Sequence, residues 1–232
     1  MEISGRCRAV SIFLKAVVVI SAALGVFITA FASKSSFMGG GRVFMFFTIQ
    51  SNIAIAIVSL IGMALLLKGR QITHTWYVIK FVATVSITLT GLVFTFILAP
   101  TMGRLAWNFQ NTLTHAVVPL VSVIDYFVTG VFGDTEKKEV FYVTLPPLAY
   151  VIYAGIGYAA GWEFAQGINY PYFFLNWGSP VRAFGFTNGF PFMGCVWWIL
   201  VLLVLLLTVG YLYLLMVDGL RIASKKRGTA EN

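Results

Sequence analysis

Six long apolar stretches restrict the fold of this chain more than any other feature of its sequence. Each is close to the ~20 residues that an α-helix needs to cross the hydrocarbon core of a bilayer. A membrane accepts either helices or closed β-barrels, and continuous apolar runs of this length exclude barrel strands. The sequence therefore predicts an all-α bundle of six transmembrane helices, over residues 11–32, 43–67, 76–98, 110–132, 140–160 and 193–217.

The composition agrees with a membrane protein. Charged residues make up 10% of the 232 residues and hydrophobic residues 59%, whereas a soluble domain carries about 25% charged residues. We therefore expect one integral membrane domain over residues 1–232, in the cell membrane or an endomembrane. The first stretch has a basic start and "AFAS" at 30–33, as a cleaved signal peptide would. Its apolar run is long enough to span, so we expect it to be retained as a helix.

The basic residues are distributed unevenly between the two sides of the predicted bundle. With six spans, both termini and the loops after the second and fourth helices share one side. Twelve Lys and Arg residues fall on that side and four on the other, so the positive-inside rule predicts cytoplasmic termini. The net charge of +8 is then a topology signal, and we expect no nucleic-acid partner. The twelve are Arg6, Arg8, Lys15, Lys68, Arg70, Lys80, Lys137, Lys138, Arg221, Lys225, Lys226 and Arg227, and the four are Lys34, Arg42, Arg104 and Arg182.

The connection over residues 161–192 is unusually apolar for a loop. It contains eleven aromatic residues but only Glu163 and Arg182 as charged residues. One interpretation is an aromatic belt at the membrane interface. The other is a lid folded over a pocket on the outer side, because long loops in compact folds are often functional.

Polar residues are concentrated at the start of the second and fourth helices. At 100° per residue, Thr48, Ser51 and Asn52 share one face of the second helix, whereas Gln50 points elsewhere. Both helices run from outside to inside, and His115 lies about as far from the start of the fourth helix as Thr48 does from the start of the second. We therefore expect Thr48 and His115 at the same depth, with Asn111 one turn above His115 on the same face.

Three interpretations fit this polar layer. In the first, Thr48 bonds back to its own helix and His115 joins two helices through a hydrogen bond. In the second, His115 is the base that activates the Thr48 hydroxyl as a nucleophile, and Asn52, Asn111 and Ser51 orient the pair or donate hydrogen bonds to an oxyanion. In the third, the layer is a polar station in a transport path.

Asp125 lies ten residues beyond His115 and therefore about 15 Å deeper by helical rise. It cannot act together with His115 from the same helix. Lys80, near the start of the third helix, lies at a comparable depth. We expect the two to form a structural ion pair, because an unpaired buried charge is costly.

Three short motifs resemble those of a known family: "FFTIQSN" in the second helix, "LTHAVVPLVSVIDYF" in the fourth and "NYPYFFLNW" in the long loop. They are similar to the androgen-induced and androgen-dependent TFPI-regulating proteins and their bacterial six-helix relatives. The resemblance implies a multipass threonine hydrolase that cleaves fatty acid esters of hydroxy fatty acids, with Thr48 and His115 in the catalytic positions. The family more often has an acidic residue at the position of Asn176.

With this resemblance, we expect an intramembrane esterase without a cofactor. One buried histidine without Cys or carboxylate at its level is a poor ligand set, so no metal is expected. The expected partners are membrane lipids and a long-chain ester that enters from the bilayer. Candidates for substrate binding are Arg104, Arg182, Trp177 and Tyr172, where the arginines would hold a substrate carboxylate. The alternative for the two arginines, which the sequence favours, is anchoring to lipid headgroups. The alternative from another class is a transporter or a membrane scaffold without catalysis.

Overall fold

The structure, a computed structural model, describes residues 3–32, 40–133 and 135–230. Helices account for 77% of the residues, and no β-strand is present in the part of the chain that is described. The predicted all-α class is therefore confirmed. The elements are α1 (Gly5–Phe27), η1 (Ile28–Ala32), η2 (Gly40–Met45), α2 (Phe47–Leu67), α3 (His74–Val93), η3 (Phe94–Leu98), α4 (Ala99–Met102), η4 (Gly103–Leu105), α5 (Phe109–Thr112), η5 (Leu113–Val117), α6 (Val118–Gly130), η6 (Lys137–Thr144), α7 (Leu145–Ala159), η7 (Phe173–Leu175) and α8 (Cys195–Ala230).

Joined end to end, these segments give six helices that are long and apolar enough to cross a membrane. They are Gly5–Ala32, Phe47–Leu67, His74–Met102, Phe109–Gly130, Lys137–Ala159 and Cys195–Ser224 within the described residues. The six predicted helices are thus present, and they indicate a multipass membrane protein. The first begins earlier than predicted because the Ser4 side chain accepts a hydrogen bond from Cys7 N and caps the helix before the apolar run starts.

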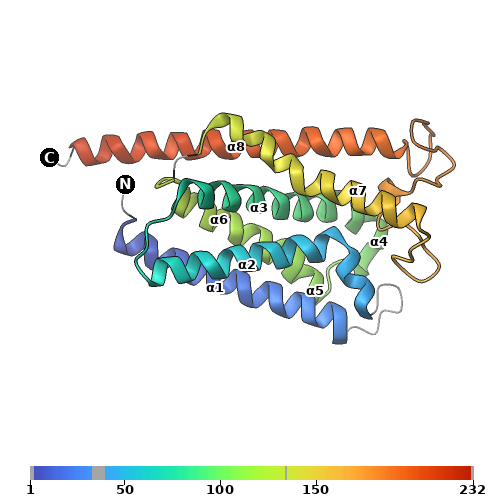
Figure 1. Ribbon diagram of the computed structural model, residues 1–232, viewed down its shortest axis with the longest axis horizontal. Coiled ribbons are helices and arrows are strands. Elements are labelled where there is room, and N and C mark those ends of the chain that lie inside the picture. Colours follow the sequence, from blue (N-terminus) through green and yellow to red (C-terminus); the bar gives the residue numbers. More distant parts are fainter. Residues whose placement is uncertain (1–2, 33–39, 134, 231–232) are drawn as a thin grey trace.

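Four of the helices form a bundle, and the other two cover one side of it. The helix α1 packs against α2 and α6, and both of these pack against α3, whereas α8 packs against η6 and α3. Figure 1 shows both termini at one end of the molecule, here called the terminal end, and the long loop after α7 at the opposite end, here called the loop end. Which end faces the cytoplasm stays a prediction from the basic residues.

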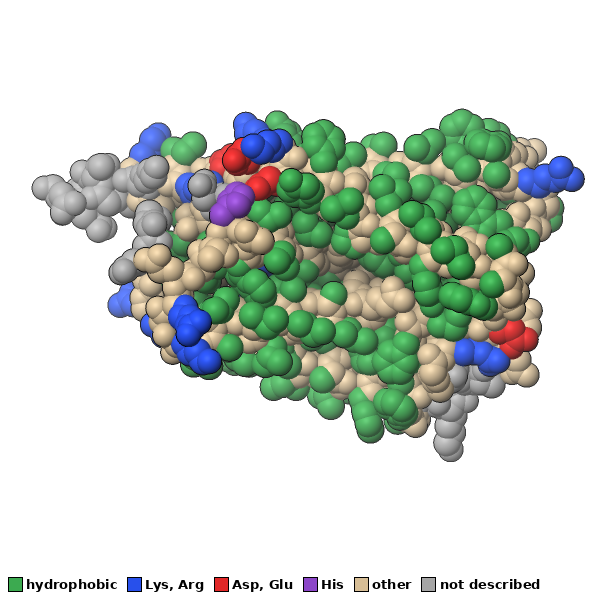
Figure 2. All heavy atoms as spheres, in the orientation of Figure 1, with side chains coloured by type: hydrophobic (Ala, Val, Ile, Leu, Met, Phe, Trp, Pro, Cys, Tyr) green, Lys and Arg blue, Asp and Glu red, His purple; other side chains and the backbone are tan. Residues whose placement is uncertain are grey.

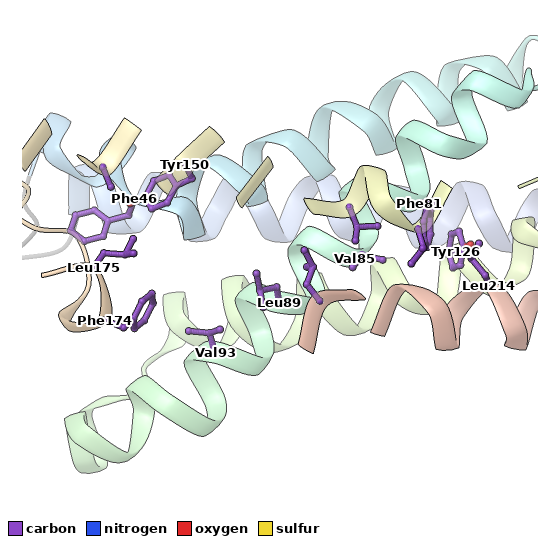
Figure 3. Packing of buried hydrophobic residues seen from close by; sticks show 14 of the residues in the cluster. Phe46, Phe81, Val85, Leu89, Val93, Tyr126, Tyr150, Phe174, Leu175 and Leu214 are labelled. Carbon is purple, nitrogen blue, oxygen red and sulfur yellow. The ribbon is translucent and has the colours of Figure 1, made fainter. Parts of the chain in front are cut away.

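The surface and the core agree with a membrane-embedded middle. In Figure 2, hydrophobic side chains cover the middle of the visible face, whereas charged side chains gather toward the two ends. Inside, one apolar cluster runs along the bundle from Phe46 and Tyr150, near the loop end, to Phe81, Tyr126 and Leu214, nearer the terminal end (Figure 3). This core packs the third helix against α7, α8 and the long loop, next to Thr48.

Candidate active site

The polar face predicted for the second helix is present at the loop end of α2. Ser51 and Asn52 are buried and Thr48 is half-buried. Gln50 turns away and donates from Nε2 to Phe44 O at 3.1 Å. The back-bonding expected in the first interpretation does not involve the Thr48 hydroxyl. Instead, the Thr48 carbonyl accepts hydrogen bonds from Ser51 Oγ at 3.1 Å and from Asn52 Nδ2 at 2.8 Å.

Thr48 lines a mostly apolar cavity of about 70 Å³, here called the Thr48 cavity. Leu89 and Val93 of α3, Val151 of α7 and Leu202 of α8 are among its apolar walls. Such walls suit an extended hydrocarbon chain with one reacting group at Thr48.

Tyr172 from the long loop closes the cavity next to Thr48. Its hydroxyl lies 3.4 Å from Thr48 Oγ1 and accepts a hydrogen bond from Thr48 N at 3.3 Å. Burial raises the pKa of the Tyr172 phenol above its ordinary value, so the phenol stays protonated at neutral pH. A neutral phenol can donate a hydrogen bond to an oxygen that becomes negatively charged beside Thr48.

The long loop has two parts, and each matches one of the two predicted roles. Phe174 and Leu175 are buried and line the Thr48 cavity together with Tyr172, as a lid over a pocket would. Phe184, Phe186, Phe190 and Phe192 are exposed large hydrophobic residues, as expected of an aromatic belt at the interface.

His115 lies in the π-helical turn η5 of the fourth helix. Pro119 follows two residues after this turn and has no N–H to donate to the His115 carbonyl, so the regular i to i−4 pattern is interrupted here. The turn η3 in the third helix has the same relation to Pro100. Single π-helical turns of this kind often occur at functional sites.

The third and fourth helices approach closely at this level. A Cβ atom on Gly91 would lie 3.0 Å from His115 O and 3.2 Å from the Pro119 ring. The ring of Phe94 stacks on the His115 ring with a centroid separation of 3.7 Å. His115 is therefore held by two contacts: its backbone carbonyl packs close to Gly91, and its imidazole ring stacks on Phe94.

The hydrogen bonds of His115 indicate which ring nitrogen carries the proton. Its Nδ1 lies 3.1 Å from Asn111 O, which can only accept. It also lies 3.0 Å from Thr114 Oγ1, whose own proton is donated to Gln110 O. Both neighbours therefore need a protonated Nδ1, and the neutral ring has its lone pair on Nε2. This tautomer is the one a general base requires when Nε2 faces the substrate.

Asn52 connects the Thr48 segment to the His115 segment. Its Nδ2 donates to Thr48 O at 2.8 Å and to Thr114 O at 3.2 Å, so these two oxygens are at most 6.0 Å apart, the sum of the two lengths. Thr48 and His115 thus belong to one layer, as expected from their depths. Among the described residues, however, no hydrogen bond joins their side chains directly. Catalytic hydrogen bonds often form only when substrate is bound.

The three predicted orienting residues make their contacts in different ways: Asn52 and Ser51 use their side chains, and Asn111 contacts His115 through its backbone carbonyl. Asn111 holds His115 with its carbonyl, while its own Nδ2 donates to Ala106 O at 2.8 Å. Ser51 Oγ lies 2.8 Å from Thr90 Oγ1. Both N–H groups of the Asn52 side chain and one of the two of Asn111 are therefore already engaged, and Tyr172, which contacts Thr48 directly, is better placed to meet an oxyanion.

The remaining candidates for substrate binding lie away from the Thr48 cavity. Arg104 lies in η4 and Arg182 in the long loop, and both are exposed. Trp177 is half-buried, and its Nε1 has no hydrogen-bond partner. Of the four candidates, Tyr172 is the one among the described residues that lines the cavity.

The ion pair predicted for Asp125 is part of a larger buried cluster. Lys80 Nζ lies 2.6 Å from Asp125 Oδ2, and Lys15 Nζ from α1 lies 2.5 Å from the same oxygen. Ser11 Oγ donates to Asp125 Oδ1 at 2.5 Å, and Thr129 Oγ1 lies 2.5 Å from Lys80 Nζ. We call Ser11, Lys15, Lys80, Asp125 and Thr129 the lysine–aspartate cluster.

Two of the twelve basic residues counted on the side of the termini, Lys15 and Lys80, are buried inside helices and do not lie in loops. Without these two, ten residues against four remain, so the asymmetry still favours cytoplasmic termini. The sequence offered one signal for the buried position of Lys15. It is a single charge inside an apolar run, four residues after Ser11, where one helix turn brings both side chains to the same face.

Other residues of the site could not be found from the sequence. Thr90 and Tyr150 line the Thr48 cavity, and Thr114 contacts Nδ1 of His115. Threonine and tyrosine are common in apolar helices, so nothing in the sequence distinguishes these three.

Comparisons of the chain with protein-family models, with curated proteins and with solved structures found no match.

Proposed function

We propose that this protein is a membrane-embedded hydrolase of long-chain esters, with Thr48 as the nucleophile and His115 as the general base. The observation that carries the proposal is the combination of a half-buried Thr48 hydroxyl on an apolar cavity with a His115 ring whose Nδ1 is held by carbonyl and hydroxyl acceptors. The resemblance of the three motifs to the threonine hydrolases supports the same assignment.

The reaction would proceed by acyl transfer in two steps. His115 Nε2 takes the proton of the Thr48 hydroxyl, and Thr48 Oγ1 attacks the ester carbonyl. The Tyr172 hydroxyl stabilises the oxyanion, the C–O bond of the ester breaks, and His115 returns the proton to the leaving alkoxide. Water then attacks the acyl-threonine with His115 again as base, and the fatty acid is released. In this reaction, the Thr48 and His115 side chains come within hydrogen-bond distance of each other when the substrate binds.

The substrate class follows from the walls of the cavity. Leucine, valine and aromatic residues make up most of the lining, and the hydroxyl-bearing residues among those that line the cavity are Thr48, Thr90, Tyr150 and Tyr172. An apolar acyl chain with a neutral ester fits this distribution. Fatty acid esters of hydroxy fatty acids, the substrates that the resemblance implies, belong to this class.

The experiment combines covalent labelling with substitution. A fluorophosphonate probe should label Thr48 in the purified protein, and mass spectrometry of the labelled peptide identifies the residue. Thr48→Ala and His115→Ala should each reduce hydrolysis of a long-chain ester by at least about 10³-fold, and the double variant should be hardly slower than either one, because residues that act as a unit are non-additive.

A matched control removes the same atoms elsewhere. Thr208 lies on the exposed face of α8 and bonds Val204 O in its own helix, so Thr208→Ala should keep full activity. Normal turnover in a folded His115→Ala variant would exclude His115 as the base. Labelling at another residue, with Thr48→Ala active, would exclude the hydrolase assignment for this site.

A further inference from the structure

A second cavity lies at the terminal end, far along the bundle from the Thr48 cavity. It has a volume of about 430 Å³ and is lined by the start of α1, the loop between α2 and α3, α3 itself and the chain after α6. We call it the terminal cavity. Its polar walls are Arg8, Arg70, Gln71 and Tyr77, and Leu66 and Phe132 are among its apolar walls.

Arg8 is held in place by the end of α2. Its Nη2 donates to Leu67 O at 3.1 Å, so one carbonyl left unpaired at the helix end is satisfied. The guanidinium lies over Gly69, whose φ of +63° favours glycine, and a Cβ there would lie 3.9 Å and 4.0 Å from the two terminal nitrogens. A guanidinium has five N–H donors, so most of them stay available after this bond.

The charges around the terminal cavity are not balanced by the described carboxylates. Each described carboxylate has a partner elsewhere: Asp125 pairs with Lys15 and Lys80, Glu136 with Lys138, Glu139 with His74, Glu163 with Arg42, and Asp218 with Arg221. Within the described residues, no carboxylate pairs with Arg8 or Arg70. Two guanidinium groups on one cavity therefore favour an anion, and their planar fork matches the oxygens of a phosphate.

We propose that the terminal cavity binds the phosphate of an anionic phospholipid. The cavity lies where the apolar helices end, which is the level of the headgroups in a bilayer, and it combines cationic and apolar walls. Figure 2 shows Lys and Arg side chains gathered at this end next to the hydrophobic middle of the molecule. Basic pockets at the ends of transmembrane helices are a recurring way to recognise anionic lipids. The lipid would join α1 to the α2–α3 loop.

The test measures lipid binding by the full-length chain in a neutral detergent, with native mass spectrometry. Phosphatidylglycerol should bind about tenfold more tightly than phosphatidylcholine, a difference of about 1.4 kcal/mol. The double variant R8Q/R70Q should lose this preference. R8K/R70K keeps both charges but not the planar fork, so it should bind several-fold more weakly, and it serves as the readout if R8Q/R70Q fails to fold.

The control variant is R6Q/K137Q, which removes the same charge from the terminal end without altering the cavity lining. It should keep the preference for phosphatidylglycerol. Equal loss in R6Q/K137Q and R8Q/R70Q would overturn the proposal, because the attraction would then be general. Retention of the preference in R8Q/R70Q would overturn it as well. Inorganic phosphate is the competitor: complete displacement of the lipid at equal concentration would overturn the assignment to a lipid.

Discussion

The bundle contains two buried polar regions that satisfy their hydrogen bonds in different ways. In the lysine–aspartate cluster, both oxygens of Asp125 have close partners, at 2.5 to 2.6 Å. In the layer around Thr48, the contacts to Tyr172 are 3.3 and 3.4 Å, and the buried Asn52 Oδ1 has no partner. Thr48 lines a cavity, whereas none of the five residues of the lysine–aspartate cluster lines either the Thr48 cavity or the terminal cavity.

This difference separates a structural role from a chemical one. A closed set of short, charge-assisted bonds stabilises one arrangement of helices and leaves no group available for a ligand. An unpaired buried acceptor such as Asn52 Oδ1 costs about 1–3 kcal/mol of stability, and a fold retains such a cost when the groups around it have another use. Substitutions in the cluster should therefore change stability, and substitutions in the Thr48 layer should change the rate.

The largest effect on stability is expected from Asp125→Asn. It leaves Lys15 and Lys80 buried without a carboxylate, and removal of one partner from a buried ion pair typically costs 3–5 kcal/mol. Thermal unfolding in detergent measures the loss, while the hydrolysis rate per folded molecule should stay close to normal. The matched control is Asp218→Asn, because the Asp218–Arg221 pair is partly exposed and should contribute about 0–1 kcal/mol.

The same comparison can be sharpened by replacing all three charged residues of the cluster. A triple variant with Lys15→Met, Lys80→Met and Asp125→Leu carries no buried charge, so it should recover most of the stability lost in Asp125→Asn. A triple variant that is stable but inactive would contradict a purely structural role for the cluster.

Two glycines offer a matched pair of small probes, one for each region. A Cβ on Gly62 would lie 2.8 Å from Lys15 Cε, and one on Gly91 would lie 3.0 Å from His115 O. Each Gly→Ala variant should lose about 1–3 kcal/mol of stability through overpacking. Gly91→Ala should also slow hydrolysis, because it moves the His115 backbone, whereas Gly62→Ala should leave the rate per folded molecule unchanged.

The control for this pair is Gly219→Ala in α8, where nothing lies within 4 Å of the added atom. It should be neutral or slightly stabilising, because alanine is the better helix former. Thermal unfolding and ester hydrolysis are measured on the same samples. If Gly62→Ala slows hydrolysis as much as Gly91→Ala does, the two regions are coupled and their separation is incorrect.

The sequence predicted these regions as far as local geometry allows. The shared face of Thr48, Ser51 and Asn52 follows from the rotation of a helix, and the pairing of Lys80 with Asp125 follows from their depths along two helices. The sequence did not identify Lys15 as a partner of Asp125, because that contact depends on how α1 packs against α6.

Contacts made through tertiary structure could not be predicted in this way. The π-helical turn around His115 and the approach of Gly91 depend on two helices packing together. The contact between Tyr172 and Thr48 depends on how a loop of more than thirty residues folds back over the bundle. The sequence marked Tyr172 as a candidate for substrate binding, but its position beside the hydroxyl of Thr48 needed the structure.

The smallest effect is expected from Tyr172→Phe, which removes a single hydroxyl beside Thr48. Loss of one hydrogen bond to a developing oxyanion should slow hydrolysis about tenfold, or about 1.4 kcal/mol, with little change in the affinity for substrate. Because burial raises the pKa of Tyr172, the wild-type phenol stays protonated from pH 7 to pH 9, and its ionisation should not reduce the rate in that interval. Tyr170→Phe, two residues away in the same loop, is the matched control. If both variants hydrolyse the ester at the wild-type rate, the Tyr172 hydroxyl takes no part in the transition state, and its contacts with Thr48 only hold the loop over the cavity.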